Sequence, residues 1–455
     1  MMGMESRVQK GSVLHNNPVA HGSGRPFIRI PGNQNGKQVE LLVTDDVLSR
    51  HSMFIGSTGC GKSNSIFQFV DFLKNSLTSD DVMIVFDTKG DYIKEFFNKE
   101  KDLLIGNSAE YRSKSQKWNL LLEITGGTDQ TKWQDNEIKL QADELCRSFF
   151  EERVKHTTNA FFPNAARAIL VGIIIDIIRS VRENPADRTS FFHNDGLRRI
   201  LIESSIEDIC NSIHNNPDMR YLLSYIDGNG EQSLGVISEM YSVINELLVG
   251  IFAERGIFSI KNFVRQRGGK TLFIEYDLGL GNSLTPIYRT LIDLALKETL
   301  SRSTRTGNVY VICDEFRLLP YLQHIDDAVN FGRSYGLKII AGLQSIEQMY
   351  EVYGTSRARN IISGFSSVYA FRANDSSTRE FYTGMHGKNI VLEQYQMRNG
   401  SITEEKRIGY VIEDWDVKAL QTGEAIITFP ERAPFLFHFK EYTPRKQRVQ
   451  TPKSR

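Results

Sequence analysis

The chain has 455 residues, of which 40% are hydrophobic and 24% are charged. This composition excludes a disordered or fibrous protein and predicts a folded chain with about two or three domains. Lysine and arginine together number 55, as do aspartate and glutamate, so any contact with a polyanion has to be local. The four cysteines lie far apart without a CxxC pair, which argues against zinc sites and disulfides and favours a reducing compartment.

The N-terminal segment, residues 1–25, is polar and rich in Gly, Asn and Ser. It has no apolar core of a signal peptide, and we expect a disordered tail. The longest apolar run, "AILVGIIIDIIRSV", is interrupted by Asp176 and Arg179 and is shorter than the ~20 residues that cross a bilayer. It therefore predicts a buried helix and a cytoplasmic chain whose membrane contact, if any, is made through a partner.

The first chemical motif follows an apolar stretch at residues 52–56. Gly56 is followed by four residues and then Gly61-Lys62-Ser63, the G-x4-G-K-[ST] pattern of a phosphate-binding loop. Its glycines let backbone N–H groups face the phosphates, the lysine reaches the β and γ oxygens, and the serine ligates Mg²⁺. The alternative is an ordinary glycine-rich turn, but a strand candidate before the loop and a helix candidate after it favour the functional interpretation. The residues predicted to bind ATP are Gly56, Ser57, Thr58, Gly59, Cys60, Gly61, Lys62, Ser63 and Asn64. Cys60 occupies a position from which the side chain is expected to point outward.

Short apolar segments rich in β-branched and aromatic residues recur along the chain. They run apolar without alternation, which is typical of strands buried on both faces of a parallel sheet. Helix-like stretches such as "SNSIFQFVDFLKNSL" lie between several of them, so the sequence predicts an α/β fold with a mostly parallel sheet. The strand candidates are residues 52–56, 82–91, 271–277, 309–315, 337–344, 367–373 and 424–430.

Residues 117–264 break this rhythm with helical patterns such as "DNEIKLQADELCRSFFEERV" and almost no strand signal. They predict an all-α insertion that divides the nucleotide-binding domain into residues 26–116 and residues 265–442. The remaining segment, residues 443–455, is basic, contains two prolines and is expected to be disordered.

Two acids, Asp314 and Glu315, end the apolar run "VYVIC". In proteins with this loop an aspartate at such a strand end helps to hold Mg²⁺. Where an additional strand separates it from the loop's strand, the adjacent glutamate polarises the attacking water. The alternative, a simple surface turn, is less favoured because the phosphate loop is present.

Two residues further along could complete the site. Gln344 ends the next strand candidate, where its side chain could contact the γ-phosphate, and Arg333 lies in "FGRSYG", from which a guanidinium could reach a neighbouring subunit. Taken alone, a capped strand end for Gln344 and a solvated turn for Arg333 would be the better interpretations.

These segments resemble the type IV secretion and conjugation coupling proteins, the TraD/TraG-type ATPases related to HerA and FtsK. The similarity covers roughly residues 40–442 in the family's order. The segments that carry it are "GSTGCGKS", "VFDTKGDY", "DEF…FGRSYGLKIIAGLQSIEQMYEVYG", "FSSVYAFRANDSSTREFYTGMHG" and "VIEDWDVKALQTGEAIITFPERAPF".

The resemblance implies a RecA-like motor domain interrupted by an all-α domain, and a ring, usually a hexamer, with ATP and Mg²⁺ between subunits. It implies that Lys62 and Ser63 bind phosphate and Mg²⁺ and that Asp314 binds Mg²⁺. It implies that Glu315 is the catalytic acid, Gln344 the sensor and Arg333 the finger in trans. Asp87 and Lys89 match the family's second motif, although a turn after a strand explains them equally well.

The expected function is ATP-driven translocation of DNA in conjugation or secretion, with non-specific DNA contact through basic segments such as residues 197–199 and 264–270. One alternative is a coupling ATPase that recruits protein substrates. Another is a soluble HerA-like ATPase whose assembly is gated by nucleotide. Coupling proteins usually begin with transmembrane helices and none is predicted here. A partner would then supply the link to the inner membrane's cytoplasmic face, and relaxosome or secretion-channel proteins are possible partners.

Overall fold

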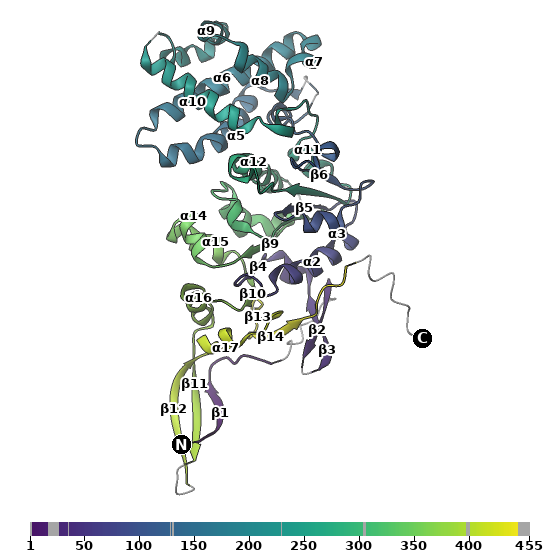
Figure 1. Cartoon of the computed structure of the whole chain (residues 1–455), viewed down its shortest axis with the longest axis vertical. Helices are drawn as coiled ribbons and strands as arrows, with labels where there is room; N and C mark the ends of the chain where they lie inside the picture. The colour runs from purple at the N-terminus through teal and green to yellow at the C-terminus, as the bar shows by residue number, and fades with distance from the viewer. Residues whose placement is uncertain are drawn as a thin grey trace.

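The computed structural model describes residues 2–16, 27–34, 36–127, 129, 132–228, 230–303, 306–396 and 401–444. The molecule is elongated, with a helical layer at one end, a large sheet in the middle and a small sheet at the other end (Figure 1). The predicted tail after residue 444 lies outside the described residues.

An eleven-stranded sheet forms the centre of the protein. Its strands from β10 to β6 run parallel, and an antiparallel extension continues beyond β10. In spatial order the strands are β3 (Lys37–Val43), β2 (Ile28–Gln34), β14 (Phe435–Phe439), β13 (Glu424–Thr428), β10 (Ser367–Phe371), β4 (Ser52–Ile55), β9 (Leu337–Leu343), β8 (Val309–Cys313), β5 (Val82–Asp87), β7 (Lys270–Glu275) and β6 (Leu103–Ile105).

The parallel strands are buried on both faces, because each face is covered by helices. On one face, Phe54 of β4 and Val85 of β5 pack in one apolar cluster with residues of α2 (Lys62–Ser76) and α3 (Asp91–Phe96). The opposite side chains of the same strands belong to a second cluster, which extends into α12 (Gly281–Leu300) and the helical layer. The predicted α/β fold with a mostly parallel sheet is confirmed.

Between β6 and β7, the described residues form helices joined by loops, and none of them belongs to a strand of either sheet. These helices form the end layer of Figure 1, and we call them the insertion. Because β6 and β7 are neighbours in the sheet, the insertion leaves and re-enters the sheet at one edge. Its α-helices are α4 (Leu120–Thr125), α5 (Asp135–His156), α6 (Phe161–Glu183), α7 (Arg188–Phe191), α8 (Asn194–Glu203), α9 (Ile206–His214), α10 (Glu231–Leu247) and α11 (Ile260–Gln266).

Helix α6 contains the apolar run noted in the sequence, and of the described helices it alone is long and apolar enough to span a membrane. However, 61% of its apolar stretch is buried inside the protein. It packs against α5 and α10, as a core helix of the insertion does. The prediction of a buried helix is therefore consistent with its surroundings.

The remaining helices lie between strands of the second half of the large sheet or beside the small sheet. They are α13 (Ile325–Phe331), α14 (Glu347–Tyr353), α15 (Thr355–Ser363), α16 (Ser376–His386) and α17 (Asp414–Ala419), and a short helix, α1 (Asp45–Ser49), precedes β4.

The small sheet corrects one prediction. Residues Met2–Lys10, which the sequence predicts to be disordered, form strand β1, antiparallel to β11 (Lys388–Gln396). Strand β11 also pairs with β12 (Ile402–Tyr410) on its other side, so β1 completes the hydrogen bonds of an otherwise open edge. Residues 17–25 of the predicted tail lie outside the described residues.

Candidate nucleotide-binding site

The phosphate loop connects β4 to α2 and is held in its shape by glycine. Gly59 and Gly61 have φ angles of 76° and 104°, which side chains rarely adopt. A Cβ atom on Gly61 would also lie 2.8 Å from the backbone nitrogen of Gly423, whereas one on Gly59 would meet nothing within 4 Å. The loop therefore needs glycine at residue 61 for two reasons and at residue 59 for one.

Hydrogen bonds from neighbouring strand ends fix the loop to the sheet. The backbone N–H of Ser57 donates to the carbonyl oxygen of Arg372, after β10, at 2.9 Å. The backbone N–H of Gly423 donates to the carbonyl oxygen of Cys60, also at 2.9 Å. These contacts leave the inner face of the loop in a preorganised curve at the N-terminus of α2, the arrangement that binds phosphate.

The Lys62 side chain curls back over the loop. Its Nζ atom donates to the carbonyl oxygen of Gly56 at 2.6 Å and lies 3.5 Å from the carbonyl oxygen of Ser57, and the residue is buried. A buried ammonium group needs acceptors, and here the loop's own carbonyls provide them. Phosphate oxygens inside the loop would meet a cation that is already in place, so this cradle fits a polyphosphate.

The two acids lie at the same edge of the sheet as the loop. Strand β9 separates β4 from β8, which is the additional strand on which the role of Glu315 depends. Thr58 Oγ1 donates to Gln344 Oε1 at 3.2 Å, and Gln344 Nε2 donates to Glu315 Oε2 at 2.7 Å. Gln344 thus bridges the phosphate loop and the glutamate, the position from which a sensor would act.

Glu315 retains one carboxylate oxygen for a further contact. Its Oε1 atom is buried but has no hydrogen-bond partner among the described residues, and the Nε atom of Arg317 lies 3.7 Å away. An unpaired buried acceptor is costly unless a ligand or water completes it. This oxygen therefore fits the predicted interaction with an attacking water molecule.

Asp314 is held by a residue to which the sequence gives no role. The hydroxyl of Tyr92, in α3, donates to Asp314 Oδ2 at 3.2 Å. Burial, and then the charges of Asp314 and Asp87, raise the pKa of Tyr92 well above its usual value, so the phenol remains a hydrogen-bond donor. One carboxylate oxygen of Asp314 is thereby oriented, as a metal ligand requires.

Asp87 has a structural role in a turn. Its Oδ1 atom accepts hydrogen bonds from the backbone N–H groups of Lys89 and Gly90 at 3.2 and 2.9 Å, and its Oδ2 atom accepts one from Ile93 at 2.9 Å. Burial raises the pKa of Asp87 although these donors favour its charged form. The Lys89 side chain is exposed at the same edge of the sheet.

Arg333 is not brought to the other predicted residues. It precedes β9, at the edge of the sheet opposite the phosphate loop, and its side chain is 49% exposed. Its Nη2 atom donates to Asp46 Oδ1 at 2.6 Å. Because it cannot reach the phosphate loop of its own chain, any role in hydrolysis has to be played in a second copy.

Two details of the predicted loop are corrected. Cys60 does not point outward: its side chain is buried in the core beneath the loop, and burial raises its pKa. The Asn64 side chain contacts the chain near the C-terminus instead of facing the phosphates, donating to Lys440 O at 3.1 Å and accepting from Tyr442 N at 2.7 Å. Ser63 remains half-exposed at the first turn of α2.

Comparison with known proteins identifies the family. The family model described as "Type IV secretion-system coupling protein DNA-binding domain" matches residues 41–437. The chain belongs to this family. The coupling protein TraD of Escherichia coli (strain K12) is 21% identical over 421 residues, covering 88% of this chain and 54% of TraD. The chain therefore spans about half the length of this relative.

Solved structures of the coupling protein TrwB share the fold. TrwB in complex with ADP and Mg²⁺ has a TM-score of 0.68 at 19% identity, covering 89% of this chain and 88% of the other. TrwB with the non-hydrolysable analogue ADPNP has a TM-score of 0.71 at 18% identity, covering 98% and 96%. At this identity the likeness concerns the fold alone, and the family's motifs identified above lie on it in the expected order.

Proposed function

We propose that this chain is the ATPase part of a coupling protein that moves DNA during conjugation or secretion. The observation that carries the proposal is the hydrogen-bonded connection from Thr58 through Gln344 to Glu315, which joins the phosphate loop to the acids at one edge of the sheet. Its coupling-protein family supports DNA as the cargo, and the ADP- and ADPNP-bound TrwB structures support the choice of nucleotide.

The residues would divide the chemistry as follows. ATP and Mg²⁺ would be held by the loop, Lys62, Ser63 and Asp314, and the metal would neutralise charge on the phosphates. Glu315 takes a proton from water through Oε1, which has no hydrogen-bond partner among the described residues and lies 3.7 Å from Arg317 Nε. Gln344 detects whether the γ-phosphate is present, because it contacts both the loop and Glu315.

We place the site between subunits of a ring, which we propose to be a hexamer. Arg333 lies at the far edge of the sheet, where its exposed side chain forms a surface ion pair with Asp46, a type of contact worth about 0–1 kcal/mol. It can leave Asp46 at little cost and reach a neighbouring subunit's nucleotide. The cytoplasmic face of the inner membrane, reached through a partner, is the location consistent with this role.

Non-specific DNA contact would use basic side chains that remain unpaired. In the segment 264–270, Arg265 is tied to Glu298 by hydrogen bonds of 2.7 and 3.1 Å, so it contributes little. Lys270 is exposed in the same segment. The basic residues after 444 lie outside the described part of the chain.

The test is ATP turnover with and without single- and double-stranded DNA over a salt series. We expect DNA to stimulate hydrolysis, with stimulation falling steeply as salt rises, because DNA binding releases counterions. Turnover that is unaffected by either DNA at low salt would contradict DNA as cargo. Absence of ATP hydrolysis under all conditions would contradict the motor itself.

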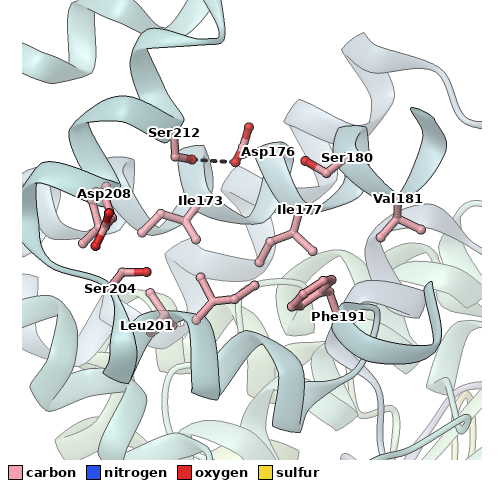
Figure 2. A pocket seen from close by; sticks show the side chains of 12 residues that line it. Ile173, Asp176, Ile177, Ser180, Val181, Phe191, Leu201, Ser204, Asp208 and Ser212 are labelled. Carbon is pink, nitrogen blue, oxygen red and sulfur yellow. Dashed lines mark hydrogen bonds between the residues drawn. The ribbon is translucent and has the colours of Figure 1, made fainter. Parts of the chain in front are cut away.

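A second candidate, protein cargo, is favoured by one cavity in the insertion. The cavity has a volume of about 340 Å³ and lies between α6, α8 and α9 (Figure 2). Its described lining is mostly apolar, with Asp176 and Asp208 but no lysine or arginine, so it repels a nucleic acid and suits an apolar segment of a protein. If this candidate is right, DNA leaves turnover unchanged while a protein substrate raises it.

A further inference from the structure

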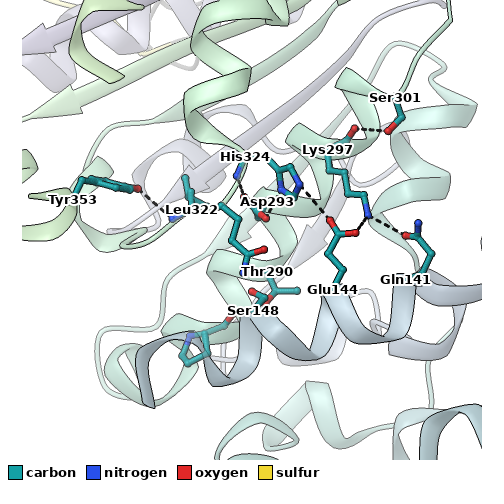
Figure 3. A network of polar contacts seen from close by, with 12 residues as sticks. Gln141, Glu144, Ser148, Thr290, Asp293, Lys297, Ser301, Leu322, His324 and Tyr353 are labelled. Carbon is teal, nitrogen blue, oxygen red and sulfur yellow. Dashed lines mark hydrogen bonds and ion pairs between the residues drawn. The ribbon is translucent and has the colours of Figure 1, made fainter. Parts of the chain in front are cut away.

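A polar network joins the insertion to the nucleotide-binding domain at His324 (Figure 3). His324 Nδ1 lies 2.7 Å from Asp293 Oδ2, in α12, and His324 Nε2 lies 3.3 Å from Glu144 Oε1, in α5. The backbone N–H of His324 also donates to Asp293 Oδ1 at 2.9 Å. Because both ring nitrogens face carboxylate oxygens, the ring has to donate on both sides and is an imidazolium.

The surroundings favour this charge. Burial alone would lower the pKa of His324, but the hydrogen bonds and charges of Asp293 and Glu144 raise it to about 9. Lys297, in α12 like Asp293, pairs with Glu144 and donates to Gln141 Oε1, also in α5, at 3.2 Å. The carboxylate of Glu144 is thus shared between two cations, and its own pKa, which burial alone would raise, is lowered to about 2 by hydrogen bonds from His324 and Lys297.

On its other side, the segment that contains His324 is held by the nucleotide-binding domain. The hydroxyl of Tyr353 donates to the carbonyl oxygen of Leu319 at 3.1 Å and accepts the backbone N–H of Leu322 at 3.3 Å. Arg357 donates to the carbonyl oxygen of Leu322 at 2.8 Å and to Asp326 at 2.7 Å. The charged groups of the network around His324 are therefore Glu144 from the insertion, and Asp293, Lys297, Asp326 and Arg357 from the domain.

The position of His324 in the chain gives the network its importance. The segment from Glu315 to Arg333 joins the proposed catalytic acid to the proposed finger, and His324 is its midpoint. The insertion contacts the segment through Glu144 and through Lys155, whose Nζ atom lies 4.1 Å from the ring centre of Tyr321, whereas the contacts of Asp293 and Tyr353 fix the segment to the domain itself. A displacement of α5 would therefore shift this segment, whose two ends are Glu315 and Arg333.

Resting on the proposed ATPase function, we infer that His324 and Glu144 are positioning residues, whose ion pair ties the insertion helix α5 to the segment between Glu315 and Arg333. Through this pair, engagement of cargo by the insertion changes the rate of ATP hydrolysis. Neither residue lies at the phosphate loop, so the pair sets the geometry of other groups and does not take part in the reaction.

The first test measures the segment directly, without nucleotide. In Glu144→Gln we expect faster amide hydrogen exchange over residues 319–331 than in the wild type at pH 7.5. The matched control is Asp143→Asn, on the same helix, because Asp143 pairs with Arg147 of α5 at 2.9 Å and with Arg167 of α6 at 3.5 Å, both inside the insertion. Equal exchange in Glu144→Gln and the wild type would overturn the inference.

The second test uses the pH dependence of DNA-stimulated hydrolysis. The wild type should lose stimulation above about pH 9, where His324 becomes neutral. In Glu144→Gln, which lacks the ion pair at every pH, stimulation should be low throughout and should show no such alkaline loss. His324→Lys should retain stimulation at pH 9.5, since lysine keeps its charge there.

The outcomes separate the inference from the proposed function. If the wild type hydrolyses ATP and responds to DNA but the alkaline limit is the same in all variants, the inference is wrong and the function stands. If the wild type shows no hydrolysis, the proposed function fails, and the exchange experiment alone decides whether the ion pair holds the segment. If Glu144→Gln does not fold, His324→Gln, which removes the same ion pair from its other end, provides the comparison.

Discussion

The site makes a strict geometric demand on Gly61, and a pair of alanine substitutions measures it. In Gly61→Ala the new methyl group would lie 2.8 Å from Gly423 N and 2.9 Å from Gly423 Cα, at a φ angle of 104°. A strained backbone angle costs about 1–3 kcal/mol and overpacking costs about 1–3 kcal/mol. We therefore expect the variant to lose about 2–6 kcal/mol of stability and to lose nucleotide binding, because the loop and residue 423 have to separate.

The control is Gly59→Ala, at a φ angle of 76° with nothing within 4 Å of the new methyl group. Only the backbone term applies, so we expect a loss of about 1–2 kcal/mol. Urea unfolding measures the two free energies, and titration with a fluorescent ATP analogue measures binding. Equal destabilisation by the two substitutions would refute the close contact between the loop and residue 423.

Four further predictions concern the site and its neighbours. Glu315→Gln should bind ATP normally while turnover falls about 10²–10⁴-fold, as single-turnover kinetics and binding assays can show; normal turnover would remove Glu315 from its role. Arg333→Ala subunits mixed with Glu315→Gln subunits should recover part of the lost activity, because mixed rings recreate intact sites, and verified mixed rings without recovery would contradict action in trans. The control Asp46→Asn, which removes the surface partner of Arg333, should leave turnover unchanged. Tyr92→Phe should raise the Mg²⁺ concentration for half-maximal turnover about tenfold, since a hydrogen bond to a charged group contributes about 1.5–3 kcal/mol. An unchanged Mg²⁺ concentration for half-maximal turnover would show that Tyr92 does not orient Asp314. The pKa of His324 is about 9 in the folded protein against an ordinary 6.5, so the stability that its charge contributes is complete below pH 6.5 and is lost as the pH rises through 9. The difference in urea midpoint between the wild type and Glu144→Gln should shrink over that range, and a constant difference would argue against the ion pair.

Much of the central sheet could be predicted because its strands are buried on both faces. Strand β5, for example, is buried at every position, and its sequence is apolar up to its last residue, Asp87. Strand β12 was not predicted, because most of its residues are exposed and polar and its pairing with β11 decides its conformation. Strand β6 has only three residues, too few to give a pattern.

The candidate site was predictable where local motifs place residues at strand ends. Lys62, Asp314, Glu315 and Gln344 all follow parallel strands, whose carboxyl ends meet at one edge. The contact between Tyr92 and Asp314 joins residues 222 positions apart, and no local pattern in the sequence predicts it. The burial of Cys60 was missed for a similar reason, since residue 423 covers the loop from a distant part of the chain.

The most direct test of the central claim is calorimetric titration of ATP, in the presence of Mg²⁺, into the wild type and into Lys62→Ala. The account predicts saturable binding of one ATP per chain by the wild type and no measurable binding by the variant, because Lys62 supplies the buried cation of the loop. Equal binding by both proteins would contradict the assignment of this edge of the sheet as the nucleotide site.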